Sequence, residues 1–598
     1  MDLLTPIEPL TQRQRTIAWS VGIVCALSRF LAMARTLWDW DETLFCLGMR
    51  SYDVGLHHPH PPGFPVFIAI ARIVRLVIHD DFRSLQAVSL ASGVLLFPAM
   101  FLLGRELRLR FETAIVAAAL CAFFPNVWFF GGTAFSDVPS IVLVIAAVAM
   151  LIRGCRDSEA YLIGTVLLAL AIGMRPQNLL VGLWPGVVAT YYRWKENWRD
   201  VIWAAVIGIV ISGVAYFSAM IATGSYDRYA GAIRAHADYI TRIDSWRSPE
   251  RPALWRLFDR FFVKQYQSQT LSIVTSIFVL VSVIGAIRNR DRRIGMITLA
   301  FVPFAISAWL MLDRFSINRF SIGYCPLFAI LAADGIDRIT LRRRNLEWLA
   351  GGLLILGFVI FTWPALTVVR TTDSPPYAAV RAAREHLDPA RDQLYVGFAM
   401  SPFVEYLDAA APWTKVLDER ALPLSQPKKR AWLLTEVDAT KPAGFVFTRG
   451  HDQLWHIARR HYFDVALEPF TAIPQFVSGW YPAERNGQEE NRWMGRQSTT
   501  ILPGRSGDSV LRLVYDVPDD LVPQRPTLTV KLNGVIIDQS PITEAHLSRD
   551  FHVEPAPGNA PNKLELAIDR TINPRAQHLG DDPRELGLLI HFLAWGVN

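Results

Sequence analysis

Residues 38–65 gather acids, histidines and prolines directly after the first apolar segment of the chain. The stretch reads WDWDETLFCLGMRSYDVGLHHPHPPGFP and contains the adjacent acids Asp41 and Glu42. A carboxylate at a membrane face can act as a general base toward an acceptor hydroxyl or amine, or it can hold a divalent cation. Acids at the start of a helix are also stabilised by the helix dipole without any chemistry. The stretch is therefore either a reaction site or solvated packing between helices.

Three histidines, His57, His58 and His60, lie just before a Pro-Pro pair in the same stretch. Imidazoles bind metals, but alternation with proline holds the backbone extended and suits chelation poorly. A more natural role is that His60 donates a hydrogen bond to a phosphate oxygen where the next helix starts. The alternative is a turn whose histidines are incidental. We expect His57 and His58, together with Asp39 and Asp53, to be structural.

Further polar residues lie at the edges of later apolar segments. Asp137, in FSDVPS, opens one segment, Arg175 lies between two short segments, and Arg319 begins another. An arginine in such a place can bind a phosphate with two parallel hydrogen bonds. The alternatives are a helix N-cap for Asp137 and contact with lipid head groups for the two arginines.

Composition indicates a membrane protein with a large soluble tail. The chain has 598 residues, of which 52% are hydrophobic, and its uncharged runs are confined to residues 17–368. A spanning helix needs about 20 apolar residues. No small-residue cleavage site follows the first segment, which we expect to be retained as a span. The five cysteines show no CxxC spacing, which argues against a disulfide framework or a thiolate metal site.

The hydrophobic pattern contains twelve apolar segments, but the distribution of lysine and arginine indicates that only eleven of them span the membrane. Lysine and arginine concentrate in cytoplasmic loops, and the basic loops share one side only if segment 62–78 does not cross. That segment carries Arg72 and Arg75, which are costly in the bilayer core and three residues apart on one helix face. We therefore predict an amphipathic helix that lies along the interface. The predicted spans are residues 17–37, 84–104, 112–130, 137–153, 159–174, 177–192, 201–222, 267–287, 294–312, 320–338 and 347–368.

With eleven spans the N-terminus is cytoplasmic and the soluble tail is outside. The loop 38–61 and the residues Asp137, Arg175 and Arg319 then share the outer face with the loop 223–266. That last loop mixes arginine, histidine and aromatic residues, which suits a sugar, a phospholipid or plain seating at the interface. The polar residues that no basic loop explains therefore converge on one side of the membrane.

The tail divides into two predicted domains after a membrane domain at residues 1–370. Residues 371–478 alternate strand-like and helical runs, which predicts a small α/β domain. Residues 479–598 contain strand-like runs separated by turn residues, including the hairpin signal Asn533-Gly534. This pattern predicts a β-sandwich.

The chain lacks the sequence signatures of nucleotide-binding loops, GxxxxGK[ST] and a strand–GxGxxG–helix unit. We expect no nucleic-acid partner. An external site has no access to cytosolic nucleotide sugars, whereas a lipid-linked donor keeps its polyprenyl tail in the bilayer and its phosphate at the face.

In order and spacing these residues resemble membrane glycosyltransferases of the GT-C superfamily. The resemblance is nearest to the branch with protein O-mannosyltransferases (glycosyltransferase family 39) and bacterial aminoarabinose transferases, and it covers residues 15–370. The motifs that carry it are Asp41-Glu42, HPPGFP at 60–65, LLGREL at 102–107, Phe124-Pro125 and SDVP at 136–139. Some members of that branch have lysine before Pro-Pro, where this chain has His60, so a permanent positive charge there is not implied.

The resemblance implies a GT-C fold and inverting transfer of a sugar from a polyprenyl-phosphate donor to a protein, lipid or glycan acceptor. Asp41 would be the catalytic base, with Glu42 orienting acceptor or donor. The donor phosphate would be held by His60, Arg175 and Arg319, and Asp137 would shape the site. The wider fold includes enzymes that need a divalent cation, and that requirement stays open here. The resemblance further implies a bacterial inner-membrane location and a sandwich similar to carbohydrate-binding modules.

Two other functions stay open. A polymerase or ligase of surface polysaccharide would use a long outer loop with paired arginines as its main site. A non-enzymatic membrane anchor would present the β-rich tail as a carbohydrate-binding module, and Asp41 would then be dispensable.

Overall fold

The computed structural model describes residues 4–595 except 244, 249–252, 264–265, 267, 312–316, 409–411, 417–428, 437–444, 449–463, 470–473, 487–488, 503–508, 555 and 557–559. Chain contacts divide the described residues into a helical unit that ends near Tyr377 and a β-rich unit that begins at Ala378. Each unit has its own core, and each is described separately.

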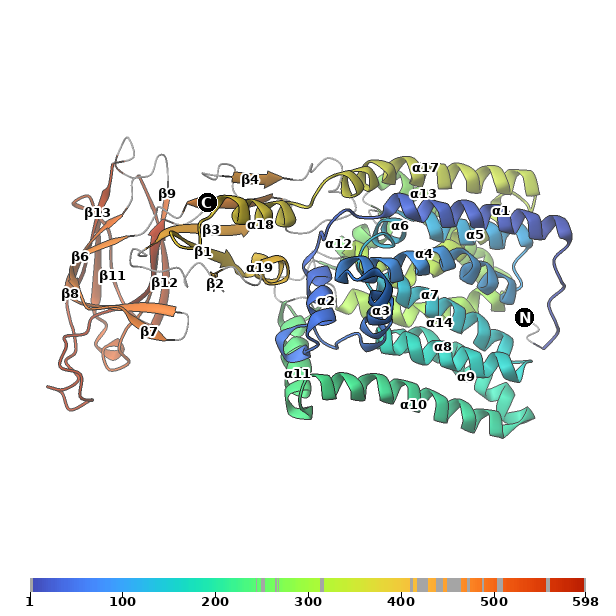
Figure 1. The fold of residues 1–598 in the computed structure, drawn as a ribbon, viewed down its shortest axis with the longest axis horizontal. Coiled ribbons are helices and arrows are strands. Elements are labelled where there is room, and N and C mark those ends of the chain that lie inside the picture. Colours follow the sequence, from blue (N-terminus) through green and yellow to red (C-terminus); the bar gives the residue numbers. More distant parts are fainter. Residues whose placement is uncertain are drawn as a thin grey trace. The chain divides into compact units, whose positions relative to one another are not determined.

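Eleven helices of the helical unit correspond to the eleven predicted spans, and most run side by side along one direction (Figure 1). Within the described residues seven helical stretches are long and apolar enough to cross a membrane, and two shorter apolar helices, α5 and α8, accompany them. The chain is therefore a multi-pass membrane protein. The eleven helices are α1 (Gln12–Arg29), α4 (Asp81–Glu106), α5 (Phe111–Phe123), α7 (Asp137–Gly154), α8 (Ser158–Met174), α9 (Asn178–Glu196), α10 (Trp198–Ala222), α13 (Gln269–Arg288), α14 (Arg292–Leu310), α16 (Cys325–Ile339) and α17 (Arg344–Thr371).

The packing of the bundle follows from the distribution of apolar residues. Helices α5, α7 and α16 are apolar around most of their circumference and are buried almost throughout, as expected for central helices. Helix α10 is equally apolar but exposes large side chains such as Ile209 and Phe217, which fits contact with lipid. All five cysteines are buried in this unit.

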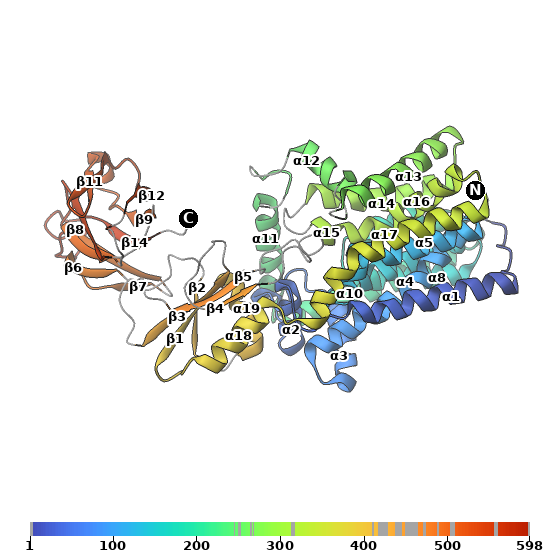
Figure 2. The same ribbon diagram turned by 90° about the horizontal axis from the view of Figure 1, so that it is seen from above.

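Short helices lie across the bundle at the end away from the N-terminus. Figures 1 and 2 show that α2 (Trp40–Arg50), α3 (Pro65–Ile78) and α11 (Tyr226–Ile243) run across the long helices. The arginines of α3 bind the protein: Arg72 donates to the Gly48 carbonyl at 2.9 Å, and Arg75 pairs with Asp81 at 2.9 Å. Residues Leu76 and Val77 of α3 are exposed and apolar. The helix predicted for residues 62–78 is confirmed. That it lies along the membrane–water interface stays a prediction.

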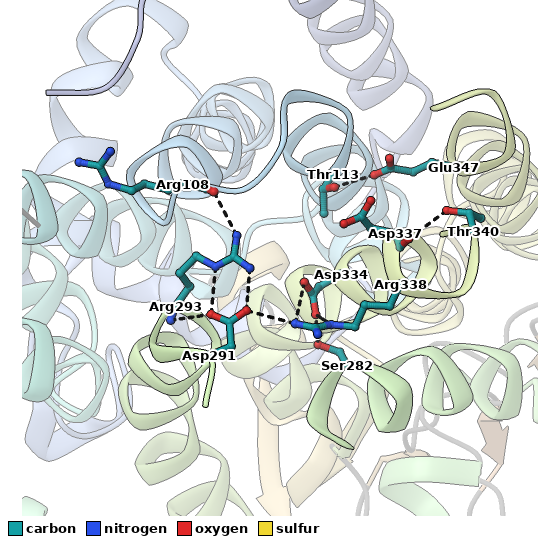
Figure 3. Close-up of polar contacts among 10 residues, drawn as sticks. All are labelled: Arg108, Thr113, Ser282, Asp291, Arg293, Asp334, Asp337, Arg338, Thr340 and Glu347. Atoms are coloured by element: carbon teal, nitrogen blue, oxygen red, sulfur yellow. Dashed lines mark hydrogen bonds and ion pairs between the residues drawn. The ribbon is translucent and has the colours of Figure 1, made fainter. Parts of the chain in front are cut away.

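At the opposite end the helices are joined by a network of ion pairs (Figure 3), which we call the basic-end network. Arg338 binds Asp334 at 2.6 Å and Asp291 at 3.1 Å, and Arg293 binds Asp291 at 2.6 Å. Arg110 pairs with Asp337 and with Glu347. These residues come from α14, α16 and α17 and from the loops before α5 and α14, so the network joins helix ends that are distant in the sequence. Its members are Arg110, Thr113, Ser282, Asp291, Arg293, Asp334, Asp337, Arg338 and Glu347.

The β-rich unit begins with the predicted α/β fold. A mixed five-stranded sheet has the order β2-β1-β3-β5-β4, in which β2, β1 and β3 are parallel and β5 is antiparallel to both of its neighbours, β3 and β4. A helical stretch predicted at residues 451–463 lies outside the described residues. The elements are α18 (Pro375–His386), β1 (Asp392–Gly397), α19 (Ser401–Asp408), β2 (Trp413–Val416), β3 (Arg430–Glu436), β4 (Phe445–Thr448) and β5 (Asp464–Pro469).

The last part of the chain forms one nine-stranded antiparallel sheet that curls into a nearly closed barrel, which differs from the predicted sandwich of two sheets. The reason is strand β8, which pairs with β14 near Trp493 and with β13 from Gln497 onward. The Asp538–Arg549 ion pair at 2.9 Å joins β11 to β12, the two ends of the strand order. The strands are β6 (Gln475–Trp480), β7 (Glu484–Asn486), β8 (Glu489–Leu502), β9 (Ser509–Asp516), β10 (Thr527–Leu532), β11 (Val535–Pro541), β12 (His546–Val553), β13 (Asn562–Ile568) and β14 (Leu589–Trp595).

The hairpin predicted at Asn533-Gly534 is confirmed. Strands β10 and β11 pair directly on either side of it, and the two turn residues have φ angles of 52° and 87°. Positive φ at both central residues is what a two-residue hairpin of this kind requires.

Candidate active site

The first turn of α2 is held in place by Glu42. Asp39 caps the helix, and its carboxylate accepts from the Asp41 main-chain N–H at 3.0 Å. The Glu42 carboxylate accepts from the main-chain N–H groups of Trp38 at 2.7 Å, Asp39 at 3.0 Å and Ala134 at 2.8 Å. Burial raises the pKa of Glu42 to about 8, against the opposing effect of these three donors. Glu42 therefore joins α2 to the loop before α7.

The loop before α7 is fixed by a close main-chain approach. A side chain at Gly132 would place its Cβ 1.8 Å from the Ala32 carbonyl oxygen, so only glycine fits there. The Gln86 side-chain amide donates to the Gly132 and Ala34 carbonyls, at 2.8 Å each. The segment that ends at Ser136 and leads into α7 is thereby anchored to α4 and to the chain that follows α1.

Asp41 faces an arginine from a segment far along the chain. Its Oδ2 lies 2.6 Å from Nη2 of Arg319, a residue of the short helix α15 (Ile317–Phe320). The Arg319 guanidinium lies 4.7 Å from the centre of the Phe135 ring. Asp41 is only 9% exposed and Arg319 6%, so this ion pair is largely withdrawn from water and is screened little by salt.

A second ion pair joins α7 to the end of α8. Arg175 follows α8 directly, and its Nη2 lies 2.7 Å from Oδ2 of Asp137, the first residue of α7. Its Nε donates to the Ser136 hydroxyl at 3.0 Å, and its guanidinium lies 5.4 Å from the Phe64 ring centre. Both predicted site arginines thus lie against an aromatic ring, as does His60, whose ring centre is 4.7 Å from that of Phe64.

His60 completes the cluster. Its Nδ1 lies 3.9 Å from Oδ1 of Asp41 and is a buried nitrogen without a hydrogen-bond partner among the described residues. Burial lowers the pKa of His60 to about 3, against the opposing effect of the Asp41 carboxylate and with the help of His236, Arg319 and Arg175. The imidazole is therefore neutral at pH 7 and can donate or accept a single hydrogen bond at each nitrogen.

The structure brings all six sequence-predicted site residues to the same end of the bundle. Four residues expected to be structural lie around them: Asp39 caps α2, Asp53 pairs with Arg228 of α11, His57 contacts the ring of His236, and His58 forms a main-chain β-bridge with Asp53. The six site residues are Asp41, Glu42, His60, Asp137, Arg175 and Arg319.

Helix α11 adds a residue that sequence reasoning did not single out. His236 lies 6.2 Å, ring centre to ring centre, from His60, and Tyr229 donates its hydroxyl to the Pro62 carbonyl at 2.9 Å. The seven-residue spacing from Tyr229 to His236 puts both on one helix face. That spacing within the mixed polar loop 223–266 was the available signal.

The arrangement combines a base with two cationic groups. Asp41 has one oxygen on Arg319 and the other directed toward His60, so it can accept a proton from a hydroxyl or amine that binds there. The guanidiniums of Arg175 and Arg319 suit a phosphate. Among the described residues, the group with metal-ligand spacing is Asp516, His546 and His591 in the β-rich unit, so a cation at Asp41 stays an expectation.

No protein-family model and no curated protein sequence matches the chain. Solved structures do match. ArnT from Cupriavidus metallidurans, bound to undecaprenyl phosphate, shares 12% identity over 77% of this chain and 98% of its own, with a TM-score of 0.47. An archaeal oligosaccharyltransferase, AglB from Archaeoglobus fulgidus, shares 12% over 67% of this chain and 65% of its own, with a TM-score of 0.42.

A longer protein matches over almost the whole chain. The arabinofuranosyltransferase AftD from Mycobacteria shares 12% identity over 98% of this chain, which spans 59% of that protein, with a TM-score of 0.42. The chain likewise spans 62% of a further structure of the Archaeoglobus oligosaccharyltransferase. The chain is thus similar in structure, at low sequence identity, to the solved structures of the Archaeoglobus oligosaccharyltransferase, ArnT and AftD.

Proposed function

We propose that the protein is a membrane glycosyltransferase that moves a sugar from a polyprenyl-phosphate donor to an acceptor outside the membrane. The observation that carries the proposal is the ion pair of Asp41 with Arg319 beside His60 and Arg175. These residues come from four separate segments of the chain. A buried base beside two guanidiniums supplies what transfer from a phosphate leaving group needs.

In this mechanism Asp41 is the general base. It takes the proton from the acceptor hydroxyl or amine as that oxygen or nitrogen attacks the anomeric carbon of the sugar. The bond from the anomeric carbon to the phosphate oxygen breaks, and polyprenyl phosphate leaves with its electron pair. Because attack and departure occur on opposite faces of the sugar, the configuration at that carbon inverts. The ion pair with Arg319 holds the Asp41 carboxylate in one orientation.

The phosphate is held by Arg175 and Arg319, and His60 adds a neutral N–H donor. Negative charge accumulates on the phosphate as the sugar departs, and guanidiniums in a site withdrawn from water stabilise that charge strongly. His60 is neutral at pH 7, so it contributes a hydrogen bond and no charge. Asp137 keeps the Arg175 guanidinium oriented through their 2.7 Å contact. Glu42 acts on α2 through the main chain, because both of its oxygens are bound there.

The membrane arrangement in this proposal has eleven crossings with the N-terminus in the cytoplasm. It rests on the arginine- and lysine-rich loops at residues 13–15, 105–110, 153–156, 193–199, 288–293 and 338–344, which share one side when segment 62–78 does not cross. The site and the β-rich unit are then outside, at the plasma membrane of a bacterium. The donor's polyprenyl tail lies in the bilayer, and the barrel-like domain contacts a carbohydrate acceptor or product.

The proposal is tested with the full-length protein in proteoliposomes supplied with polyprenyl-phosphate sugars and an acceptor extract. Mass spectrometry of glycans and glycolipids from a strain that lacks the protein selects the sugar and acceptor to use. Asp41→Asn is expected to lower transfer at least 10²-fold, the contribution typical of a general base. Asp53→Asn is the matched control, because Asp53 lies in the same loop and pairs with Arg228.

Three outcomes distinguish the alternatives. Transfer by Asp41→Asn near the wild-type rate refutes Asp41 as the base. Transfer of preassembled blocks, with no single-sugar product, favours a polysaccharide polymerase or ligase. A phenotype lost on deletion of residues 378–598 but kept in Asp41→Asn favours a membrane-anchored binding module.

A further inference from the structure

A second group of chemically capable side chains lies in the β-rich unit, on three neighbouring strands. Strand β9 runs between β12 and β14, and it ends at Asp516. Across one side, His546 of β12 is the direct register partner of Asp516. Across the other side, Leu589 of β14 is its partner, two residues before His591. Asp516, His546 and His591 therefore come from three strands that are well separated in the sequence.

An irregularity in β14 puts His591 beside Asp516. In a regular strand the side chains alternate between the two faces of the sheet. Here Ile590 and Leu593 both belong to the hydrophobic core, and the register shifts between Ile590 and Phe592. The extra residue is His591, so two consecutive residues separate the core positions. Such a bulge redirects a side chain, and in this strand it brings His591 to Asp516.

The three side chains converge through their ligand atoms. His591 Nε2 lies 2.8 Å from Asp516 Oδ2, and His546 Nδ1 contacts Asp516 Oδ1. One ligand atom from each residue lies within 4.8 Å of the others. The side chain of His591 is 18% exposed, whereas those of Asp516 and His546 are 38% and 59% exposed, so the group opens to solvent.

Asn491 of β8 supports His591 from behind. The Asn491 side-chain oxygen lies 3.0 Å from His591 Nδ1. Asn491 thus lies against the ring nitrogen that faces away from Asp516, while Nε2 faces the carboxylate. A partner that orients the far nitrogen of a histidine is also the usual surrounding of a metal ligand.

We propose that Asp516, His546 and His591 bind a divalent transition metal, with Zn²⁺ as the best match. Two imidazoles and one carboxylate form a ligand set typical of zinc, whereas Ca²⁺ and Mg²⁺ prefer oxygen ligands throughout. Zinc takes four ligands, so one position is left for water or for a donor atom of a bound carbohydrate. The metal fastens the end strand β12 to β9 and β14. This site does not depend on the proposed transferase function.

The test uses the full-length protein without a histidine tag, stripped of metal and held in lipid nanodiscs. Zn²⁺ binding is measured by equilibrium dialysis for wild type, for His591→Ala and for His546→Ala. Each variant is expected to bind one Zn²⁺ fewer per chain than wild type. His552→Ala is the matched control, because His552 is exposed on the same strand β12 and lies outside the group. It is expected to bind as much Zn²⁺ as wild type.

Two further measurements keep the test decisive if a variant folds poorly. Co²⁺ added to wild type is expected to give the visible absorption of a four-coordinate site, which Zn²⁺ displaces and Ca²⁺ does not. Zn²⁺ is expected to raise the melting temperature of wild type and of His552→Ala, and not that of Asp516→Asn. Equal Zn²⁺ binding by wild type and both histidine variants, or no four-coordinate Co²⁺ spectrum, overturns the proposal.

Discussion

The two ends of the helical unit each contain buried aspartate–arginine pairs, yet they are built differently. At the basic-end network, Arg338 lies between Asp334 and Asp291, and Asp334 also accepts from Ser282 at 2.6 Å (Figure 3). At the other end, Asp41 lies between Arg319 and a histidine nitrogen with no hydrogen-bond partner among the described residues. Ion pairs alone therefore do not indicate a site, and neither does a buried nitrogen without a partner, since Arg108 Nε beside the network also lacks one among the described residues.

The helices around the two clusters differ as well. The network joins the ends of long helices and the loops between them, where arginines and acids stabilise helix termini. The site lies among short helices, α2, α3, α11 and α15, that cross or interrupt the bundle. The same pair of residue types therefore joins regular helix ends at one end of the unit and irregular segments at the other.

The largest expected difference between the ends is in catalysis. Arg319→Gln removes the cation that contacts Asp41, so we expect transfer to fall about 10²–10³-fold, the usual cost of losing one preorganised charge partner. Arg338→Gln at the other end is expected to keep the rate per folded molecule within about twofold, because it touches no part of the site. Initial rates in proteoliposomes measure both. Equal losses would show that the two ends are not functionally distinct.

The next effect is on stability and belongs to the basic end. Arg110→Gln leaves Asp337 and the fully buried Glu347 without their cation. Breaking a buried ion pair costs about 3–5 kcal/mol, and since Arg110 is 33% exposed we expect the lower end of that range. Thermal unfolding in detergent measures the loss. Arg153→Gln is the control, because its 3.5 Å pair with Asp157 is exposed on both sides and contributes under about 1 kcal/mol.

The smallest effect is a difference in pH dependence. Glu42 has a pKa of about 8, raised by burial from 4.5, so the stability it contributes is complete below about pH 4.5 and is lost as the pH rises to about 8. Asp291 has a pKa of about 2, lowered by its hydrogen bond from Arg293. The stability that Asp291 contributes is complete above the ordinary aspartate pKa of 3.8 and is lost as the pH falls toward 2.

Melting curves between pH 3 and pH 9 test this contrast. Relative to wild type, Glu42→Gln is expected to flatten the decline in melting temperature between about pH 5 and 8, and Asp291→Asn is expected to flatten the decline on the acid side. Identical pH slopes in wild type and Glu42→Gln would mean that Glu42 is ionised in the folded protein at neutral pH.

Part of this arrangement could be predicted from the sequence because it depends on local patterns. Apolar run length predicted the eleven long helices of the bundle but not the polar helix α11, which forms within the predicted loop 223–266. The balance of arginines singled out α3, whose Arg72 and Arg75 bind polypeptide. The side-of-membrane argument also grouped Asp41 with Arg319, although these residues are far apart in the chain. It could not predict which oxygen contacts which nitrogen, because that depends on the loops between helices.

The role of Glu42 could also have been predicted from the sequence, whereas the strand registers of the β-rich unit could not. The spacing of Asp39 and Glu42 is that of a capping box, which would have predicted a structural role for Glu42 at the start of α2. The barrel follows from the bend of β8 near Trp493, and the extra residue at His591 follows from the register of β14. Strand registers depend on pairing across distant segments, so the strand-like runs alone could not determine them.

The bonds made by Glu42 constrain how the chain can vary. Its carboxylate accepts hydrogen bonds from the main-chain N–H groups of residues 38, 39 and 134. These hydrogen bonds do not depend on which side chains those residues have. Related sequences can therefore differ at these positions as far as packing and the helix cap permit and still hold α2 in place. Proline is the exception, since it has no N–H. A library randomised at residue 134 should yield functional variants of several small residue types, with proline absent.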